Sequence, residues 1–190
     1  MRVVIVGAGA LGSHVVQFLR NVECDLVVVD PDRVEAKNLA NQFHGKPGTG
    51  KLKVAALSQA MLFLYGKVVA SNPHKLVEDN VAAILGKADL VVDCLDNYAG
   101  RKLVQDFVRY KAIPCLHGAL AADGQYGRVV WDSAFIIDAE AKAGEPTCHG
   151  GDHLPFIALV SAYLSRAAQE FIATGKKRGY EVNPAGAFST

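Results

Sequence analysis

Residues 2–12 read RVVIVGAGALG, an apolar, β-branched run followed at once by Gly7, Gly9 and Gly12. At this spacing Gly7 permits a tight turn, Gly9 lets the backbone approach a phosphate, and Gly12 lets the next helix pack against the strand. The N–H groups at the start of that helix then face an anionic ligand. The stretch predicts a strand, a phosphate-binding turn and a helix, although a close-packed junction without a ligand has the same pattern.

Short apolar segments alternate with stretches of helical periodicity along the rest of the chain. Leu11, Val15 and Phe18 repeat at helical spacing, as do Val54 and Leu57. This alternation is typical of βαβ units and predicts an α/β, Rossmann-like, doubly wound and mainly parallel sheet with a short antiparallel extension. We expect parallel strands at 2–6, 25–30, 66–70, 89–94 and 113–116, antiparallel strands at 127–131 and 135–138, and a long helix at 156–172.

Length, composition and charge bound the domain organisation and the partners. The chain has 190 residues, 51% of them hydrophobic, which suits one core. We expect a single nucleotide-binding domain over residues 1–175 and a C-terminal tail, 176–190, which is loosely ordered from Gly179 to Thr190. The net charge of +1 from 20 basic and 19 acidic residues favours neither a nucleic-acid nor a membrane partner. The apolar stretches are shorter than the roughly 18 residues of a membrane span. The N-terminus begins directly as a strand, and we therefore predict a cytoplasmic protein.

Acidic and amide side chains follow the second strand. Asp30 lies where an acid commonly accepts hydrogen bonds from a ribose, which fits both NAD and ATP. Asp32 either orders the following loop or supports Asp30. Asn38, Asn41 and Gln42 offer amides that can bridge phosphate, ribose and backbone, or else form a surface loop that uses asparagine for its turns. Together with the glycine turn these residues predict a nucleotide site.

A second group of charged residues surrounds the expected crevice. A glycine-rich hinge delivers Lys51 and Lys53 to the start of a helix, where one of them can neutralise phosphate charge. Asp93 and Asp96 flank the end of the fourth strand, at the edge where open α/β sheets bind ligands. A carboxylate beside a triphosphate is most useful as a magnesium ligand, although Asp93 could instead brace the turn.

The cysteines have two different settings. Cys24, Cys94 and Cys115 fall in or beside apolar strands and form no C-x-x-C pair, so no structural zinc is expected. Cys148 lies in a polar, glycine-rich loop before a helix. It is a candidate reactive thiol, a candidate metal ligand with His117 or His44, or an ordinary loop cysteine.

Taken together, these motifs give the chain a family resemblance. From Val3 to about Ile172 it resembles the ThiF/MoeB/HesA family, bacterial relatives of the ubiquitin-activating E1 enzymes. The resemblance implies a fold that binds Mg-ATP and adenylates a carboxylate with pyrophosphate release, commonly the C-terminal glycine of a ubiquitin-like or sulfur-carrier protein. It is carried by the glycine turn, D-x-D-x-V at 30–34, N-L-x-x-Q at 38–42, G-x-x-K at 50–53, D-C-x-D-N-x-x-x-R at 93–101, and the His117-Gly118-Ala119 and Gly124-Gln125 segments.

The resemblance also implies roles for individual residues. By position, Asp30 binds the ribose, Lys53 contacts the phosphates and Asp96 holds Mg²⁺, so ATP and Mg²⁺ are the expected cofactors. Arg101 orients the acceptor carboxylate or Asp96, or forms a structural salt bridge. Cys148 lies where E1 relatives can take up the activated acyl group. The acceptor is a small ubiquitin-like protein or a small-molecule acid, and family members are usually dimers, which implies a homodimer or a heteromer.

Two departures from the family pattern keep alternatives open. Asn41 stands where relatives usually carry an arginine, and no counterpart of their N-terminal helix, with its second arginine, precedes the first strand. Adenylation needs cationic support for its transition state and for the departing pyrophosphate. The chain could therefore be a catalytically degenerate nucleotide-binding subunit of a heteromeric complex. An NAD(P)-dependent oxidoreductase is supported only by the glycine turn and Asp30.

Overall fold

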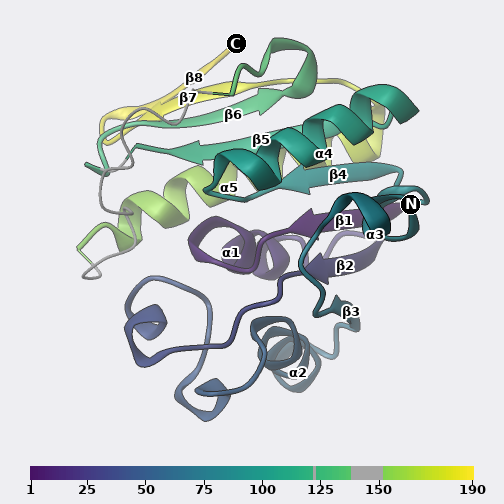
Figure 1. Ribbon diagram of the computed structural model, residues 1–190. Coiled ribbons are helices and arrows are strands. Elements are labelled where there is room, and N and C mark those ends of the chain that lie inside the picture. Colours follow the sequence, from purple (N-terminus) through teal and green to yellow (C-terminus); the bar gives the residue numbers. More distant parts are fainter. Residues whose placement is uncertain (122, 138–151) are drawn as a thin grey trace.

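The computed structural model describes residues 1–121, 123–137 and 152–190. One sheet runs through the molecule with helices on both faces (Figure 1). Its strands are β1 Arg2–Val6, β2 Asp25–Val29, β3 Val69–Asn72, β4 Leu90–Asp93, β5 Cys115–Leu120, β6 Gly127–Trp131, β7 Tyr180–Asn183 and β8 Gly186–Ser189. The helices are α1 Ala10–Phe18, α2 Lys53–Tyr65, α3 Glu78–Leu85, α4 Tyr98–Lys111 and α5 Leu154–Thr174, with short 3₁₀ turns η1 Ala36–Ala40, η2 Lys46–Gly48 and η3 Asp132–Ala134.

Five parallel strands form the first half of the sheet, in the order β3-β2-β1-β4-β5. The chain moves outward from β1 in one direction and then returns to its other side at β4, so the strand order reverses between β1 and β4. In open α/β sheets, ligands bind at the carboxyl ends of the strands at this switch point. The Rossmann-like, doubly wound fold predicted from the sequence is confirmed, and the glycine turn follows β1 at the point where the strand order reverses.

The two faces of the sheet carry separate apolar layers. Side chains of Val3, Ile5 and Val28 pack with α1, α2 and α5, whereas Val4 and Val91 on the other face pack with α3 and α4. Strands buried on both faces are typical of parallel sheets. The third strand begins three residues later than the predicted 66–70, because Gly66 ends α2 in the left-handed conformation with φ 65°.

The antiparallel extension differs from its prediction. β6 pairs with β5 as expected, but the predicted strand at 135–138 is wrong for residues 135–137, and Asp138 lies outside the described residues. After β6 the η3 turn leads the chain toward α4, where the Gln105 amide donates a hydrogen bond to the Phe135 carbonyl at 3.1 Å. That backbone group is therefore used against a helix and not in the sheet.

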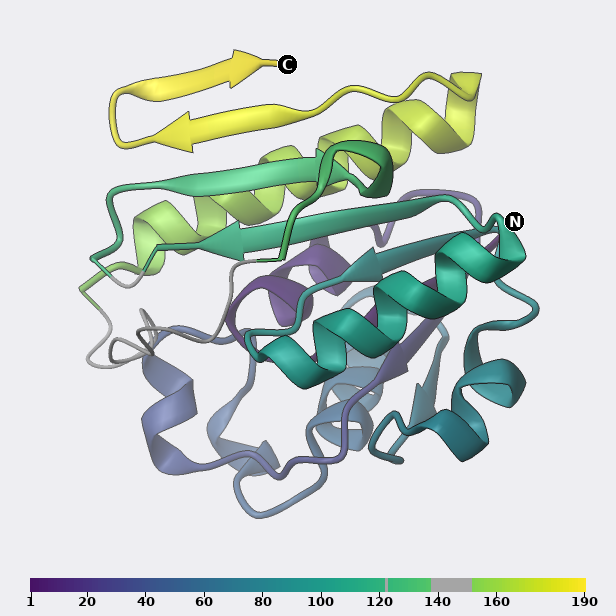
Figure 2. The ribbon, with the colours of Figure 1, turned by 45° about the horizontal axis from the view of Figure 1, so that its top comes forward.

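The C-terminal residues supply the missing strands. β7 pairs antiparallel with β6, and β8 returns beside β7 as a hairpin (Figure 2). Tyr180 and Val182 point into the core under α5, whereas Glu181 between them is exposed. The expected loose order of the tail is thus wrong for residues 180–189, because two buried side chains at alternate positions hold the strand on the sheet.

Helix α5 packs along α1 and closes the apolar layer on that face. It covers the predicted 156–172 and extends by two residues at each end. Within the described ranges, no helix combines the length and the apolar character that crossing a bilayer requires.

Candidate functional site

The glycine turn after β1 is shaped by two glycines that packing requires and one that it does not. Gly7 has φ +96°, and a Cβ on Gly12 would lie 1.8 Å from the Gly7 carbonyl oxygen. A Cβ on Gly9 would meet only the Gln42 side-chain nitrogen, at 4.0 Å. Nothing in the described fold therefore excludes a side chain at Gly9, and the space beside it suits a ligand that approaches the backbone.

Asp30 fixes this turn from the end of β2. Its Oδ2 accepts a hydrogen bond from the Ala8 N–H at 2.7 Å, and its Oδ1 accepts one from the Asp32 N–H at 2.8 Å. Each oxygen keeps a second lone pair. The buried carboxylate can therefore order the turn and still accept a hydrogen bond from a hydroxyl group of a ligand.

Asp32 connects Asp30 to Lys53. The Lys53 Nζ lies 3.2 Å from Asp32 Oδ2, and the Lys53 N–H donates to the Asp32 carbonyl at 2.8 Å. Lys53 is largely buried at the first position of α2, whereas the Asp32 side chain is 67% exposed. These contacts place a cation beside Asp32, two positions after the acid that holds the glycine turn, and the role of Asp32 stays a prediction.

His44 completes the support of the turn, a role that the sequence did not reveal. Its Nε2 lies 2.9 Å from the Ala8 carbonyl oxygen, so this nitrogen carries the proton and donates. Burial lowers the pKa of His44, and the nearby Lys53 charge lowers it further. The other ring nitrogen, Nδ1, is buried and has no hydrogen-bond partner among the described residues. The weak signal in the sequence was its place two residues after Gln42.

The three amides of 38–42 do different things. The Asn38 Oδ1 accepts the Glu35 N–H at 2.8 Å, so this side chain builds the η1 turn. Asn41 is 1% exposed, and its backbone carbonyl oxygen accepts a hydrogen bond from His14 Nε2 at 3.3 Å. Gln42 is the amide beside Gly9, and its buried Oε1 lacks a partner within the described parts of the chain. The Gln42 atom that lies toward Gly9 is the amide nitrogen, which can donate a hydrogen bond to a ligand there.

At the end of β4, Asp93 and Asp96 are separated by a tight turn. Asp93 is fully buried, and its Oδ1 accepts the Leu95 N–H at 3.0 Å. Asp96 follows this turn and is exposed. The Arg101 guanidinium donates to the Gly118 carbonyl at 2.8 Å and lies 3.9 Å from Asp93 Oδ2. Arg101 thus holds α4 against β5, as in the structural alternative considered above, and its role at Asp96 stays a prediction.

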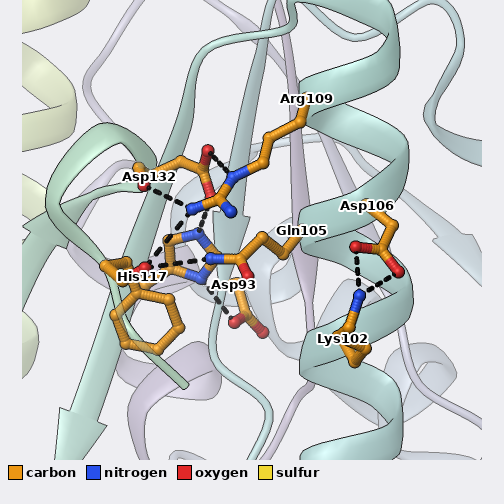
Figure 3. A network of polar contacts seen from close by, with 8 residues as sticks. Asp93, Lys102, Gln105, Asp106, Arg109, His117 and Asp132 are labelled. Carbon is orange, nitrogen blue, oxygen red and sulfur yellow. Dashed lines mark hydrogen bonds and ion pairs between the residues drawn. The ribbon is translucent and has the colours of Figure 1, made fainter.

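A polar network between the sheet and α4 was not predicted from the sequence (Figure 3). The buried His117 ring has Nδ1 2.8 Å from Asp93 Oδ2 and Nε2 3.2 Å from Asp132 Oδ1. Arg109 donates from Nε to Asp132 Oδ2 at 2.8 Å, and Phe135 stacks on His117 with 4.0 Å between ring centroids. The residues come from β4, β5, η3 and α4, which spacing along the chain alone does not bring together.

The described residues also include a cavity beside α4 and two cysteines near the site. A cavity of about 420 Å³ lies between α4 and the chain after β6, lined by residues that include Tyr98, Lys102 and Ile136. Burial raises the pKa of the Cys94 and Cys115 thiols far above the ordinary range, which disfavours the nucleophilic thiolate of both. Cys148 lies outside the described residues, and within them no three His, Cys, Asp or Glu side chains are grouped to hold a metal ion.

Comparison with known proteins assigns the family. The model of the ThiF family matches residues 1–174. The chain belongs to the ThiF family. It is 38% identical over 149 residues to the SAMP-activating enzyme E1 of Haloferax volcanii, covering 76% of this chain and 55% of that protein. It is also 38% identical over 127 residues to the sulfur carrier protein adenylyltransferase of Thermus thermophilus, covering 65% and 47%.

Solved structures show the same fold. E. coli MccB with ATP superposes with a TM-score of 0.78 at 15% identity, covering 100% of this chain and 63% of that chain. PaaA gives a TM-score of 0.77 at 16% identity, covering 100% and 62%. This ThiF-family chain spans about half the length of the two curated relatives named above.

Proposed function

We propose that this ThiF-family chain binds Mg-ATP at the glycine turn and transfers the adenylyl group to a carboxylate. The observation that carries the proposal is the turn itself. Asp30 holds the Ala8 N–H and His44 holds the Ala8 carbonyl oxygen, while the space beside Gly9 stays open. The Gln42 side-chain nitrogen, 4.0 Å from the position that a Cβ on Gly9 would take, adds a polar group to that space. Relatives named as adenylyltransferases support the reaction class.

The side chains around the turn divide the recognition of ATP between them. The N–H groups at the start of α1 face the phosphates, where the helix dipole favours negative charge. The free lone pairs of Asp30 accept hydrogen bonds from the ribose hydroxyls. Lys53, held by Asp32 at 3.2 Å, supplies positive charge to the phosphates. His44 keeps the turn in place, and the Gln42 amide lies beside Gly9.

The reaction follows from the placement of charge. An oxygen of the acceptor carboxylate attacks the α-phosphorus of ATP, the bond from that phosphorus to the bridging oxygen breaks, and pyrophosphate leaves with the electron pair. The product is a mixed acyl-phosphate anhydride with AMP. Lys53 and the helix N-terminus stabilise the charge that accumulates on the phosphate oxygens. Asp96, exposed after the turn that Asp93 closes, is the residue we assign to Mg²⁺, which would neutralise phosphate charge when bound.

The names of the relatives support one class of acceptor. The Haloferax and Thermus proteins are named for activating SAMP and a sulfur carrier protein. We therefore propose the C-terminal carboxylate of a small carrier protein as the acceptor, with a small-molecule acid as the other outcome of the test. Cys148 stays a candidate for receiving the activated acyl group.

A second candidate function rests on Asn41. This residue is 1% exposed and its backbone carbonyl is held by His14, and the family resemblance implies that its neutral side chain stands where relatives usually have an arginine. The chain could bind ATP and depend on a partner for the missing cation.

Large apolar side chains are exposed near the end of α2, including Phe63 at 88% and Val68 at 74%, and such patches mark protein contacts. We propose that the protein acts as a dimer, a state that light scattering measures.

Trapping of the activated acceptor tests the proposal. The protein, Mg-ATP and a small carrier protein with a free C-terminal glycine are incubated with hydroxylamine, which converts an acyl-adenylate to a hydroxamate. Mass spectrometry should find the hydroxamate at the carrier C-terminus with the wild-type chain and lose it with Asp96→Asn. A carrier lacking its terminal glycine is the matched control. ATP binding without hydroxamate formation for any carboxylate favours the partner-dependent subunit.

A further inference from the structure

The Asp93 carboxylate needs a partner because it is fully buried at the end of β4. A buried carboxylate is tolerated when it is hydrogen-bonded or paired with a cation. Arg101 reaches only to 3.9 Å, whereas His117 Nδ1 lies at 2.8 Å from Oδ2. His117 is therefore the group that fixes the orientation of Asp93, and it leaves Oδ1 turned to the Leu95 N–H.

The His117 ring is itself held at both of its nitrogens and on one face. His117 is the register partner of Asp93 on β4 and of Val130 on β6, which places it on the sheet face under α4. Its Nε2 lies 3.2 Å from Asp132 Oδ1, and Phe135 stacks on it with 12° between the ring planes. A ring with both nitrogens engaged and one face covered does not change rotamer freely.

These contacts form a continuous chain that ends at the proposed magnesium residue. Asp132 and Phe135 hold His117, His117 holds Asp93, and Asp93 holds the turn after which Asp96 emerges. We propose that His117 is a positioning residue for adenylation, which sets the turn that presents Asp96 to Mg-ATP. This role rests on the proposed function. It gives the buried contacts of His117 with Asp93 and Asp132 a function, whereas packing of the sheet against α4 does not require polar side chains there.

Two substitutions at His117 separate the arms of the network. The amide nitrogen of asparagine falls near the place of Nδ1, and that of glutamine near the place of Nε2. His117→Asn therefore keeps the hydrogen bond to Asp93, and His117→Gln keeps only the contact with Asp132. Lys102→Gln, which removes an ion pair with Asp106 on the outer side of α4, is the matched control.

The readouts are the magnesium dependence of ATP–pyrophosphate exchange, and ATP binding by calorimetry with and without magnesium. His117→Gln should raise the magnesium concentration for half-maximal exchange about tenfold and lower kcat, with ATP binding in the absence of magnesium unchanged. His117→Asn and Lys102→Gln should stay within about twofold of the wild type. Equal behaviour of the asparagine and glutamine variants overturns the role of His117.

Folding and the proposed function are controlled separately. Thermal melts establish that each variant is folded, and should His117→Gln fail to fold, Asp132→Ala carries the test because it releases the ring from its outer side. An unchanged magnesium dependence in that variant overturns the proposal. The wild type is measured first: absence of exchange with every acceptor contradicts the proposed function and this inference with it, whereas an active wild type with indistinguishable variants contradicts only the role of His117.

Discussion

The Ala8 N–H and the Asp30 carboxylate, 22 positions apart in the chain, are joined by a hydrogen bond of 2.7 Å. On the other side of the same residue, His44 donates to the Ala8 carbonyl oxygen at 2.9 Å. Both polar groups of one residue in the glycine turn are thus fixed before a ligand arrives. A turn ordered in this way loses little conformational freedom on binding, which favours affinity for phosphate.

Asp30→Ala should weaken both folding and ATP binding. It leaves the N–H groups of Ala8 and Asp32 without their acceptor, at a cost of about 1–3 kcal/mol of unfolding free energy. Asp30→Asn keeps one side-chain oxygen and should lose less stability while still binding ATP more weakly. Urea denaturation and calorimetry measure the two effects, and wild-type ATP affinity in Asp30→Ala would contradict the account of the turn.

Gly9 and Gly12 should respond differently to the same substitution. Gly12→Ala forces a Cβ to within 1.8 Å of a carbonyl oxygen and should destabilise the fold by about 3 kcal/mol or more. Gly9→Ala should fold within about 1 kcal/mol of the wild type and raise the Kd for ATP at least tenfold, because the methyl group enters the ligand space. Undiminished ATP affinity in a folded Gly9→Ala protein would show that the ligand does not approach there.

The unfolding free energy should fall as the solution becomes more acidic than about pH 6.5, the pKa of an unperturbed histidine. Burial is the main cause that lowers the pKa of His14 and of His44 in the folded protein. The unfolded chain then binds these protons at a higher pH than the folded chain, so stability is complete above this pH and is lost as the pH drops toward the folded pKa values. Urea denaturation at several pH values measures the slope, which His44→Gln should reduce. A slope of opposite sign would contradict the buried neutral state.

The thiols of the half-buried Cys94 and the buried Cys115 should resist alkylation in the native protein. Burial raises the pKa of Cys94 and Cys115, so iodoacetamide at neutral pH should label both only after unfolding. Peptide mass spectrometry of native and urea-treated protein measures this. Rapid native labelling of Cys94 would contradict the raised pKa of its thiol. The labelling rate of Cys148 in the same sample tests its predicted reactivity.

Local patterns predicted the parallel half of the fold and the placement of the turn residues. The β-branched strand before Gly7 and the acid after β2 follow rules that involve neighbours in sequence and one βαβ unit. The β7–β8 hairpin was not predicted because its four-residue strands have little periodicity of their own. They are stabilised by pairing with β6 and by burial of Tyr180 and Val182.

The polar contacts that support the site depend on tertiary structure. Nothing in the spacing of Asp93, His117 and Asp132 indicates that one ring bridges two carboxylates, since the contact needs the β4–β5–β6 register. His44 reaches Ala8 across 36 positions for the same reason. Sequence motifs therefore indicated the candidate binding residues. Only the fold revealed the side chains that hold those residues in position.

Exchange of labelled pyrophosphate into ATP tests the central claim most directly. The protein is assayed with Mg²⁺ and a small carrier protein that has a free C-terminal carboxylate, with Asp96→Asn and a carrier lacking its terminal glycine as controls. We expect label to enter ATP only with magnesium and the intact carrier, and to fall at least about tenfold in Asp96→Asn. Undiminished exchange in that variant, or ATP binding without exchange for every carboxylate tested, would contradict the assignment of this chain as an adenylating enzyme that holds magnesium at Asp96.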